Sequence, residues 1–382
     1  MGAVYDQAVV AFDDYNTHGV SGSGVKRPVK ADIREMARLI DAGRMWSITD
    51  FGCVGDGNEA GTSGTDNTST LSSAIDSGES LFIPSGKFLH DADAIVMTTD
   101  GQRIVGNGRQ KSFLICPTST GRAWKVEGVS RAEMSGLSMK FADAVARTSG
   151  QKLLSLESSD NCTFSHLDLR YGNTQVDIES CIDMTFDHLL VLAGALGIRV
   201  AATLATYAHT CNNLYFKNVN SQSNTAGMIR VDQSGSENIS SIALVDCGTS
   251  EDGTVSSGNY SIDLRGMVKG GATSGARISG LWAEGLPQAL LRFDGPVGDT
   301  NSFRTFSMRD STIIVPGASA YTLSLIGVID HTVVDITGVN AISSGATHTF
   351  DFGAATAGEC RAGMNQFGTT CTKNVSSAVD IT

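Results

Sequence analysis

Two short apolar patterns recur in a fixed order along most of the chain, and this recurrence limits the possible folds more than any other feature. The first pattern is an apolar residue, two spacers, then apolar-x-apolar; its copies begin at residues 134, 164, 186, 216, 239, 278, 303 and 333. The second pattern, apolar-x-apolar, falls once in each interval, as in Val176-Asp-Ile178. Intervals that vary from 22 to 39 residues indicate a solenoid with constant strands and variable turns.

The predicted fold is all-β: a right-handed parallel β-helix, a single-stranded solenoid, over residues 45–352. One coil cannot bury its own apolar side chains, so coils are expected to stack about 4.8 Å apart, with like residues in ladders. An antiparallel sandwich would lack the recurrence of two strands in fixed order. A short N-terminal helical adaptor is predicted for residues 1–44, because Ile33, Met36, Ala37 and Ile40 fall on one helical face. Residues 65–76 are predicted to form a capping helix, and residues 353–382 a C-terminal cap.

Composition excludes several classes of protein. A net charge of -12 argues against a nucleic-acid partner, which would require basic surface. The sequence has no 18-residue apolar run and no signal-like start, so neither membrane insertion nor Sec export is expected. The eight cysteines include no C-x-x-C pair, and no metal or cofactor is predicted. Cys360 and Cys371 are the candidate disulfide; the other cysteines are either disulfide-bonded or buried free thiols.

The segments WSITDFGCVGDG and LFIPSGKFL, with a short helix between them, resemble the beginning of the pectin lyase-like superfamily, although Cys53 replaces its common Ala. The residues in front of them resemble the N-terminal adaptor of phage tailspike and tail-fibre proteins. The resemblance implies a homotrimeric virion tailspike, assembled in the host cytoplasm and acting outside the cell. Residues 1–44 would bind a phage tail or baseplate protein, and the solenoid would bind and depolymerise a bacterial surface polysaccharide. The alternatives are a non-catalytic structural or adhesive spike and, third, a secreted cell-wall enzyme.

The second pattern also places charged residues between its apolar positions, where a strand would turn them toward solvent. These residues include Asp177 and Glu179, and two columns across successive coils: Arg230, Asp263 and Arg292, then Asp232, Arg265 and Asp294. One interpretation is a set of structural ion pairs. The other is that Asp232 and Asp294, about 9.6 Å apart, are catalytic carboxylates that flank a sugar held by Arg265.

The longest interval, between Ile239 and Ile278, contains a second candidate site. Its loop carries Glu251 and Asp252, and the next copy of the first pattern is followed by Trp282 and Glu284. Long loops on a rigid scaffold often carry function. We expect a groove in which Glu284 is a further catalytic candidate, and Trp282, Glu251 and Asp252 bind substrate. A subunit contact is an equal alternative for an outward Trp.

Two other sets of residues recur at equivalent positions. His166, His188 and Asn218 follow the first apolar residue of the first pattern by two positions; a polar ladder across a turn is expected there, with a catalytic base as the alternative. Three apolar residues, Leu190, Leu192 and Val245, are predicted to point outward. They are candidates for a subunit interface in a trimer.

Overall fold

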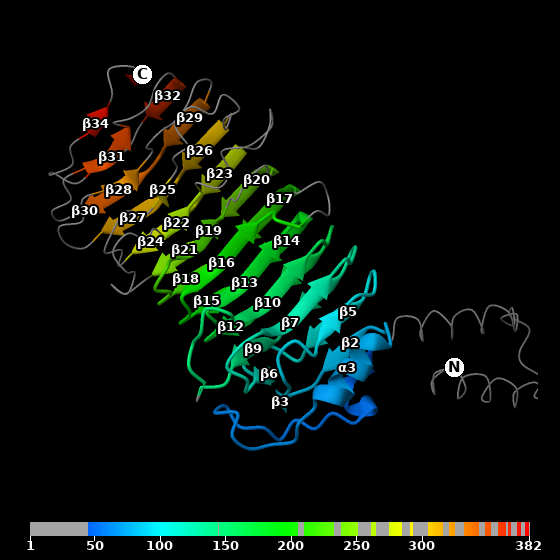
Figure 1. The fold of residues 1–382 in the computed structure, drawn as a ribbon. Helices are drawn as coiled ribbons and strands as arrows, with labels where there is room; N and C mark the ends of the chain where they lie inside the picture. The colour runs from blue at the N-terminus through cyan, green and yellow to red at the C-terminus, as the bar shows by residue number, and fades with distance from the viewer. Residues whose placement is uncertain are drawn as a thin grey trace, which may run out of the picture. The chain divides into compact units, whose positions relative to one another are not determined.

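A computed structural model describes residues 45–143, 145–204, 210–232, 238–250, 261–264, 275–284, 291–292, 305–315, 321–324, 332–343, 348–352, 358–363, 366–367, 373–375 and 379–381. Its strands form three sheets, and each strand pairs in parallel with the strand one coil away. Figure 1 shows the strands of each sheet stacked in chain order from β2 to β32. The predicted parallel β-helix is therefore confirmed.

Each coil contributes one strand to each sheet. Sheet A consists of β1 (Trp46–Ser47), β2 (Leu81–Ile83), β5 (Arg103–Gly106), β8 (Glu133–Ser135), β11 (Thr163–Ser165), β14 (Ile182–Asp187), β17 (Thr210–Lys217), β20 (Asn238–Val245), β23 (Gly275–Ser279), β26 (Thr305–Arg309), β29 (Thr332–Thr337), β32 (Gly358–Gly363) and β35 (Val379–Ile381). Sheet B consists of β3 (Gly86–Leu89), β6 (Ser112–Cys116), β9 (Ser138–Phe141), β12 (Asp168–Arg170), β15 (Leu190–Leu192), β18 (Asn220–Gln222), β21 (Gly248–Ser250), β24 (Trp282–Glu284), β27 (Thr312–Val315), β30 (Asn340–Ser343) and β33 (Gln366–Phe367). Sheet C consists of β4 (Val96–Met97), β7 (Arg122–Glu127), β10 (Lys152–Glu157), β13 (Thr174–Glu179), β16 (Leu196–Ala201), β19 (Ile229–Val231), β22 (Ile262–Asp263), β25 (Leu291–Arg292), β28 (Tyr321–Ser324), β31 (His348–Phe352) and β34 (Lys373–Val375).

Ladders of like apolar side chains fill the interior. Phe164, Phe186 and Phe216 are fully buried and stack with ring centroids 5.5 and 4.8 Å apart. Sheet C supplies a second ladder, which consists of Leu154, Val176, Ile198, Ile229 and Ile262. Because truncation of a buried Phe to Ala typically costs about 3 to 5 kcal/mol, such ladders are a major stabilising element of the coil.

The sequence predicted two strands per coil, and the structure has three. The first pattern spans two strands: Phe164 lies in sheet A, whereas Leu169 lies in sheet B. The bend between them is made by His166, whose φ is 53°. Asn218 occupies the same position two coils later with a φ of 51°. Asn, Asp and His tolerate this left-handed conformation better than most residues other than Gly, so these coils bend without Gly, whereas Gly136 and Gly280 make the same bend in other coils.

The register of three copies of the first pattern also differs from the prediction. Below Phe216, the ladder continues through Leu244, Ile278, Met308 and Ile336, not through the expected residues 239, 303 and 333. In β20 the apolar residues 239, 242 and 244 are all buried, so their spacing fits more than one register. The register is fixed by the left-handed bend two residues after each ladder position. The spacing of apolar residues alone does not reveal where this bend lies.

The two ends of the solenoid differ in how well they were predicted. The expected capping helix is present as α3 (Thr68–Asp76), which follows the 3-10 helix η1 (Ile48–Phe51) and buries Leu71, Ala74 and Ile75. At the other end, β32 to β35 extend all three sheets, so the expected end of the coil at residue 352 is too early. Strand pairing uses backbone groups, and a Gly- and Thr-rich segment can therefore continue it.

Six cysteines of the described residues are free and buried. Burial raises the pKa of the Cys211 thiol to about 12, and buried thiols with raised pKa are poor nucleophiles. The adaptor segment 1–44, Cys371 and the side chain of Cys360 lie outside the described residues. In the parts of the chain that the structure describes, no helix has the length and apolar character needed to cross a membrane.

Candidate functional site

A groove on the outer face of sheet B contains the most exposed large aromatic side chain of the described residues. Trp282 is 50% exposed and pairs with Gly248 of the preceding coil. Gly248 has no side chain, and a Cβ there would lie in ordinary van der Waals contact with Oδ1 of Asn220, at 3.5 Å. The groove has a volume of about 350 Å³, and its polar lining includes Asn218, Asn220, Gln222, Asp246, Thr249, Ser250 and Glu284.

Glu284 orients the exposed indole. The Nε1 of Trp282 donates a hydrogen bond to Oε2 of Glu284 at 3.3 Å, which restrains a side chain that would otherwise rotate in solvent. The structure thus brings together two of the residues proposed from the sequence, and the residues 246–250 line the same groove. Their predicted partners Glu251 and Asp252 lie outside the described residues.

Polar side chains form a ladder at the bend between sheets A and B, next to the groove. The rings of His166 and His188 stack in parallel with centroids 4.7 Å apart, as expected for a ladder across a turn. Asp187 pairs with Nδ1 of His188 at 2.8 Å and accepts a hydrogen bond from Nδ2 of Asn218 at 3.1 Å. Partial burial raises the pKa of Asp187, but the hydrogen bonds from His188 and Asn218 outweigh this effect and lower it overall. The ladder therefore positions Asn218 at the edge of the groove.

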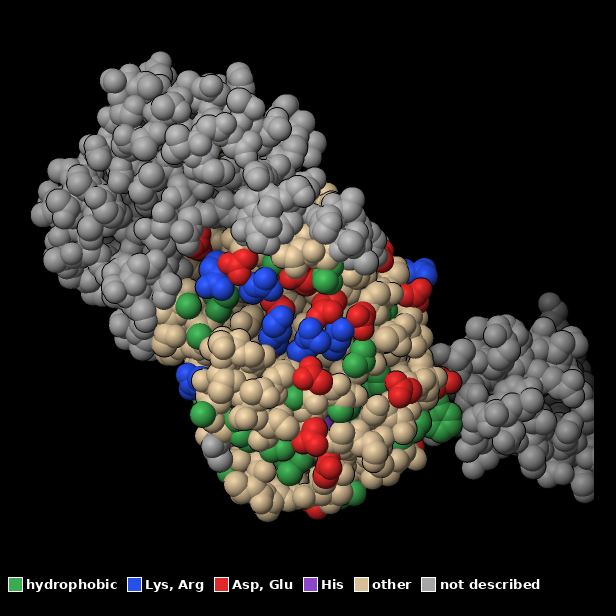
Figure 2. Space-filling view, in the orientation of Figure 1, with side chains coloured by type: hydrophobic (Ala, Val, Ile, Leu, Met, Phe, Trp, Pro, Cys, Tyr) green, Lys and Arg blue, Asp and Glu red, His purple; other side chains and the backbone are tan. Residues whose placement is uncertain are grey.

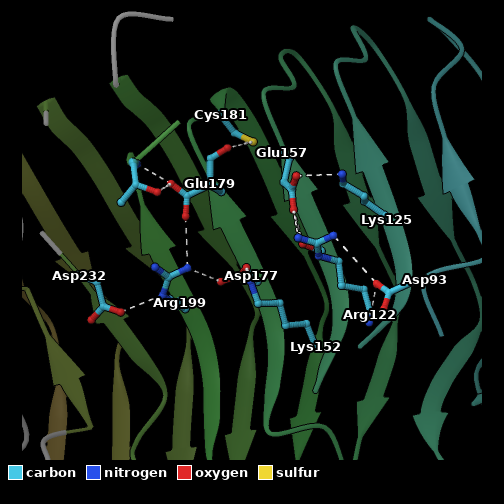
Figure 3. A network of polar contacts seen from close by, with 12 residues as sticks. Asp93, Arg122, Lys125, Lys152, Glu157, Asp177, Glu179, Cys181, Arg199 and Asp232 are labelled. Atoms are coloured by element: carbon cyan, nitrogen blue, oxygen red, sulfur yellow. Dashed lines mark hydrogen bonds and ion pairs between the residues drawn. The ribbon is translucent and has the colours of Figure 1, made fainter. Parts of the chain in front are cut away.

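The outer face of sheet C is charged, and its acids are buried. The sequence predicted that Asp177 and Glu179 face solvent, but their side chains are only 1% and 10% exposed. Asp177 forms ion pairs with Lys152 and with Nη1 of Arg199, the latter at 2.8 Å. Glu179 accepts a hydrogen bond from Oγ1 of Thr203 at 2.7 Å. The prediction was wrong because longer cationic side chains from neighbouring coils cover these short acids (Figure 3).

Asp232 is part of the same network. Its two oxygens lie 2.8 Å from Nε of Arg199 and 2.7 Å from Nε of Arg230. Burial lowers the pKa of Arg199, but Asp177 and Asp232 more than compensate and raise it overall. Asp232 is thus engaged as a counter-ion, which favours the ion-pair interpretation. Its proposed catalytic partners lie outside the described residues, namely Asp294 and Arg265.

The predicted column of charges that contains Arg230 is present in sheet C. In the strand register, Arg230 lies opposite Asp263, and Asp263 lies opposite Arg292 of the next coil. Asp263 was also expected to face solvent and is 4% exposed. Figure 2 shows Lys and Arg side chains gathered in the middle of this face, with Asp and Glu side chains beside them. Opposite charges therefore alternate in register along this column.

Sequence analysis did not identify several residues of the sheet B groove. Asn220 and Gln222 were missed because sheet B strands have only a few residues and follow the bend directly. The useful signal was the polar bend residue itself: Asn218 and Asp246 each precede a groove-facing residue by two positions. Alignment of the coils on this bend, not on the apolar residues, would have placed these residues together.

No protein-family model and no curated protein matches this chain. Solved structures do. The tailspike of Acinetobacter phage vb_AbaP_AS12 matches with a TM-score of 0.59 and 9% identity over 89% of this chain, which spans 62% of the tailspike's length. An alginate lyase from Paenibacillus sp. matches with a TM-score of 0.55 and 14% identity, over 83% of this chain and 98% of the enzyme. The Streptococcus pneumoniae surface protein and adhesin PfbA matches with a TM-score of 0.54 and 12% identity, over 89% of this chain and 100% of the adhesin. At these identities, the similarity shows a shared fold.

Proposed function

We propose that the protein is a phage tailspike subunit that binds a bacterial surface polysaccharide through the sheet B groove. The observation that carries the proposal is the half-exposed, hydrogen-bonded indole of Trp282 beside Gly248, in a groove lined by amides and hydroxyls. An indole offers a flat apolar surface to a sugar ring. Side chains such as Asn220 and Gln222 can both donate to and accept from sugar hydroxyls.

The comparisons support this proposal at the level of fold. A phage tailspike and an alginate lyase have the same coil, so a parallel β-helix is a scaffold on which such proteins are built. The proposal further includes assembly as a homotrimer in the host cytoplasm and attachment to the tail or baseplate through residues 1–44. The half-buried apolar side chains of Leu190, Leu192 and Val245 are the proposed subunit contact.

Cleavage of the bound polysaccharide is the second part of the proposal. Glycoside hydrolysis uses two carboxylates, and Asp246 and Glu284 both line the groove. Glu284 is the preferred candidate because its carboxylate already lies next to the exposed indole. The alternative is a non-catalytic adhesive spike, and the fold is also that of an adhesin.

Intrinsic fluorescence can test binding directly. The chain has three Trp residues; Trp124 is fully buried, whereas Trp282 is half exposed. Titration of the purified protein with surface polysaccharides from a panel of bacterial strains should change the Trp emission for a host polysaccharide. Trp282→Ala should abolish the change in emission and weaken the binding measured by calorimetry roughly tenfold to a hundredfold. Tyr215→Ala removes another exposed aromatic, 38% exposed in sheet A, and should bind normally. Normal binding by Trp282→Ala would refute the proposed site.

Cleavage needs a separate measurement on the polysaccharide that binds. New reducing ends would show hydrolysis, and ultraviolet absorbance from unsaturated sugars would show a lyase. Retained binding without either product would favour the adhesive alternative.

A further inference from the structure

Two pairs of like charges lie on directly adjacent coils of sheet C. Arg199 pairs in register with Arg230, and Arg122 pairs with Lys152. Strands in a sheet lie about 4.8 Å apart, and like charges at directly opposed positions destabilise it. Each pair therefore requires negative charge nearby.

The first pair has a carboxylate that bridges it. Asp232 contacts Nε of Arg199 with one oxygen and Nε of Arg230 with the other, at 2.8 and 2.7 Å. One carboxylate thus neutralises both guanidinium groups at once. In this pair, an acid of the protein itself offsets the repulsion between two cations on adjacent coils.

The second pair has no shared carboxylate among the described residues. Arg122 pairs with Glu157 at 3.0 Å and more distantly with Asp93 at 4.0 Å, whereas Lys152 pairs with Asp177. In place of a bridging acid there is a pocket of about 460 Å³, which Arg122 and Lys152 line together with Lys125, Asp93, Val96 and two glycines. Asp232 lies two residues after Arg230, whereas the residue two positions after Lys152 is the buried Leu154, so no acid stands at that position.

Arg122 and Lys152 lie nearer to solvent than their acid partners Glu157 and Asp177, whereas Asp93 is 57% exposed. The side chains of Arg122 and Lys152 are 35% and 28% exposed, whereas those of Glu157 and Asp177 are 11% and 1% exposed. Figure 3 shows Arg122, Lys125 and Lys152 with these acids on the same face. A ligand that enters the pocket would therefore meet cationic groups, with one exposed acid, Asp93, among the lining residues.

We propose that this pocket binds an oxyanion, specifically the carboxylate of an acidic sugar, between Arg122 and Lys152. Arg presents a fork of donors that matches a carboxylate, and Lys152 adds a second charge. The ligand carboxylate would take the bridging role that Asp232 has in the first pair. The site is on a different sheet from the Trp282 groove, so it is independent of the function proposed for that groove.

The test uses a variant that supplies the missing acid. Gly150 lines the pocket, and a side chain added there meets no atom within 4 Å. Gly150→Asp should occupy the anion position, and Gly150→Asn is the matched uncharged control. Calorimetry at constant ionic strength would measure binding of trigalacturonate, of neutral trigalactose and of sodium sulfate. Wild type and Gly150→Asn should bind trigalacturonate but not trigalactose, and Gly150→Asp should bind it at least about tenfold more weakly.

Arg122→Gln provides a second test that does not depend on the folding of Gly150→Asp. It removes one of the two bridged cations and should also weaken trigalacturonate binding by about tenfold or more. Equal affinity of wild type and both variants would overturn the proposal, as would equal binding of trigalacturonate and trigalactose. Binding of sulfate alone would support an oxyanion site but overturn its assignment to an acidic sugar. Tyr215→Ala, which removes an exposed aromatic side chain of sheet A, should bind trigalacturonate as wild type does.

Discussion

The outer faces of sheets B and C are built on the same coil, yet their polar groups behave differently. On sheet C, long cations reach across neighbouring coils, and acids such as Asp177 are buried in ion pairs with them. On sheet B, the outward positions of adjacent coils are Asn220, Gly248 and Trp282, whose side chains are too short or too apolar to pair in this way. The contrast indicates that the charges of sheet C mainly stabilise the fold, apart from those that line the Arg122–Lys152 pocket, while the part of sheet B around Trp282 leaves its polar groups open to a ligand.

Removal of a buried acid from sheet C should give the largest effect. Asp177→Ala leaves Lys152 and Arg199 without their shared partner, and loss of one member of a buried ion pair costs about 3 to 5 kcal/mol. Chemical denaturation should show this loss. Glu284→Ala, the matched change on sheet B, should alter stability by less than about 0.5 kcal/mol. Similar losses for the two variants would contradict the distinction between the faces.

His90 sets the pH range in which the two faces can be compared. It lies just after β3, is 1% exposed, and burial lowers its pKa from 6.5 to about 4. The folded state therefore favours the neutral imidazole. The stability that this provides is complete above pH 6.5 and is lost as the pH falls from 6.5 to about 4, by about 3 kcal/mol in total.

Denaturation across this pH range can isolate the contribution of His90. His90→Gln should be less stable at neutral pH because it disturbs a packed site, but its stability should decline less steeply below pH 6.5. An identical slope in wild type and variant would show that His90 is not the responsible group. Binding measurements on either face are best made above this range, where the fold is fully stable.

Truncation of the exposed indole should affect binding and not folding. Trp282→Ala should reduce polysaccharide affinity by about 1.5 to 3 kcal/mol, the usual value of a buried aromatic contact, or roughly tenfold to a hundredfold. Its denaturation midpoint should match that of wild type, because the side chain is half exposed. Equal affinity but lower stability would instead identify Trp282 as a packing residue or subunit contact.

The sequence predicted the coil well because its evidence is periodic. The recurrent apolar residues, such as Phe164, Phe186 and Phe216, have one physical role and appear in every coil. It missed sheet B because the bend before it depends on backbone conformation at residues such as His166, which apolar spacing does not encode. It misjudged Asp177 because burial on an outward face depends on side chains from other coils. The alternation of apolar and polar residues along a strand therefore predicts which way a side chain points, but not how exposed it is to solvent.

The smallest expected effect on binding comes from Glu284→Gln, and it separates two roles of the same residue. The amide oxygen of Gln can still accept the hydrogen bond from Nε1 of Trp282, so the indole should keep its orientation and affinity should change by less than about 0.5 kcal/mol. If Glu284 is also the acid that cleaves the polysaccharide, product formation should be lost, because an amide cannot transfer the proton. Glu284→Ala removes both the acceptor and the acid and should weaken binding as well. If Glu284→Gln cleaves at the wild-type rate, Glu284 is not the catalytic acid, and its role is limited to positioning the indole.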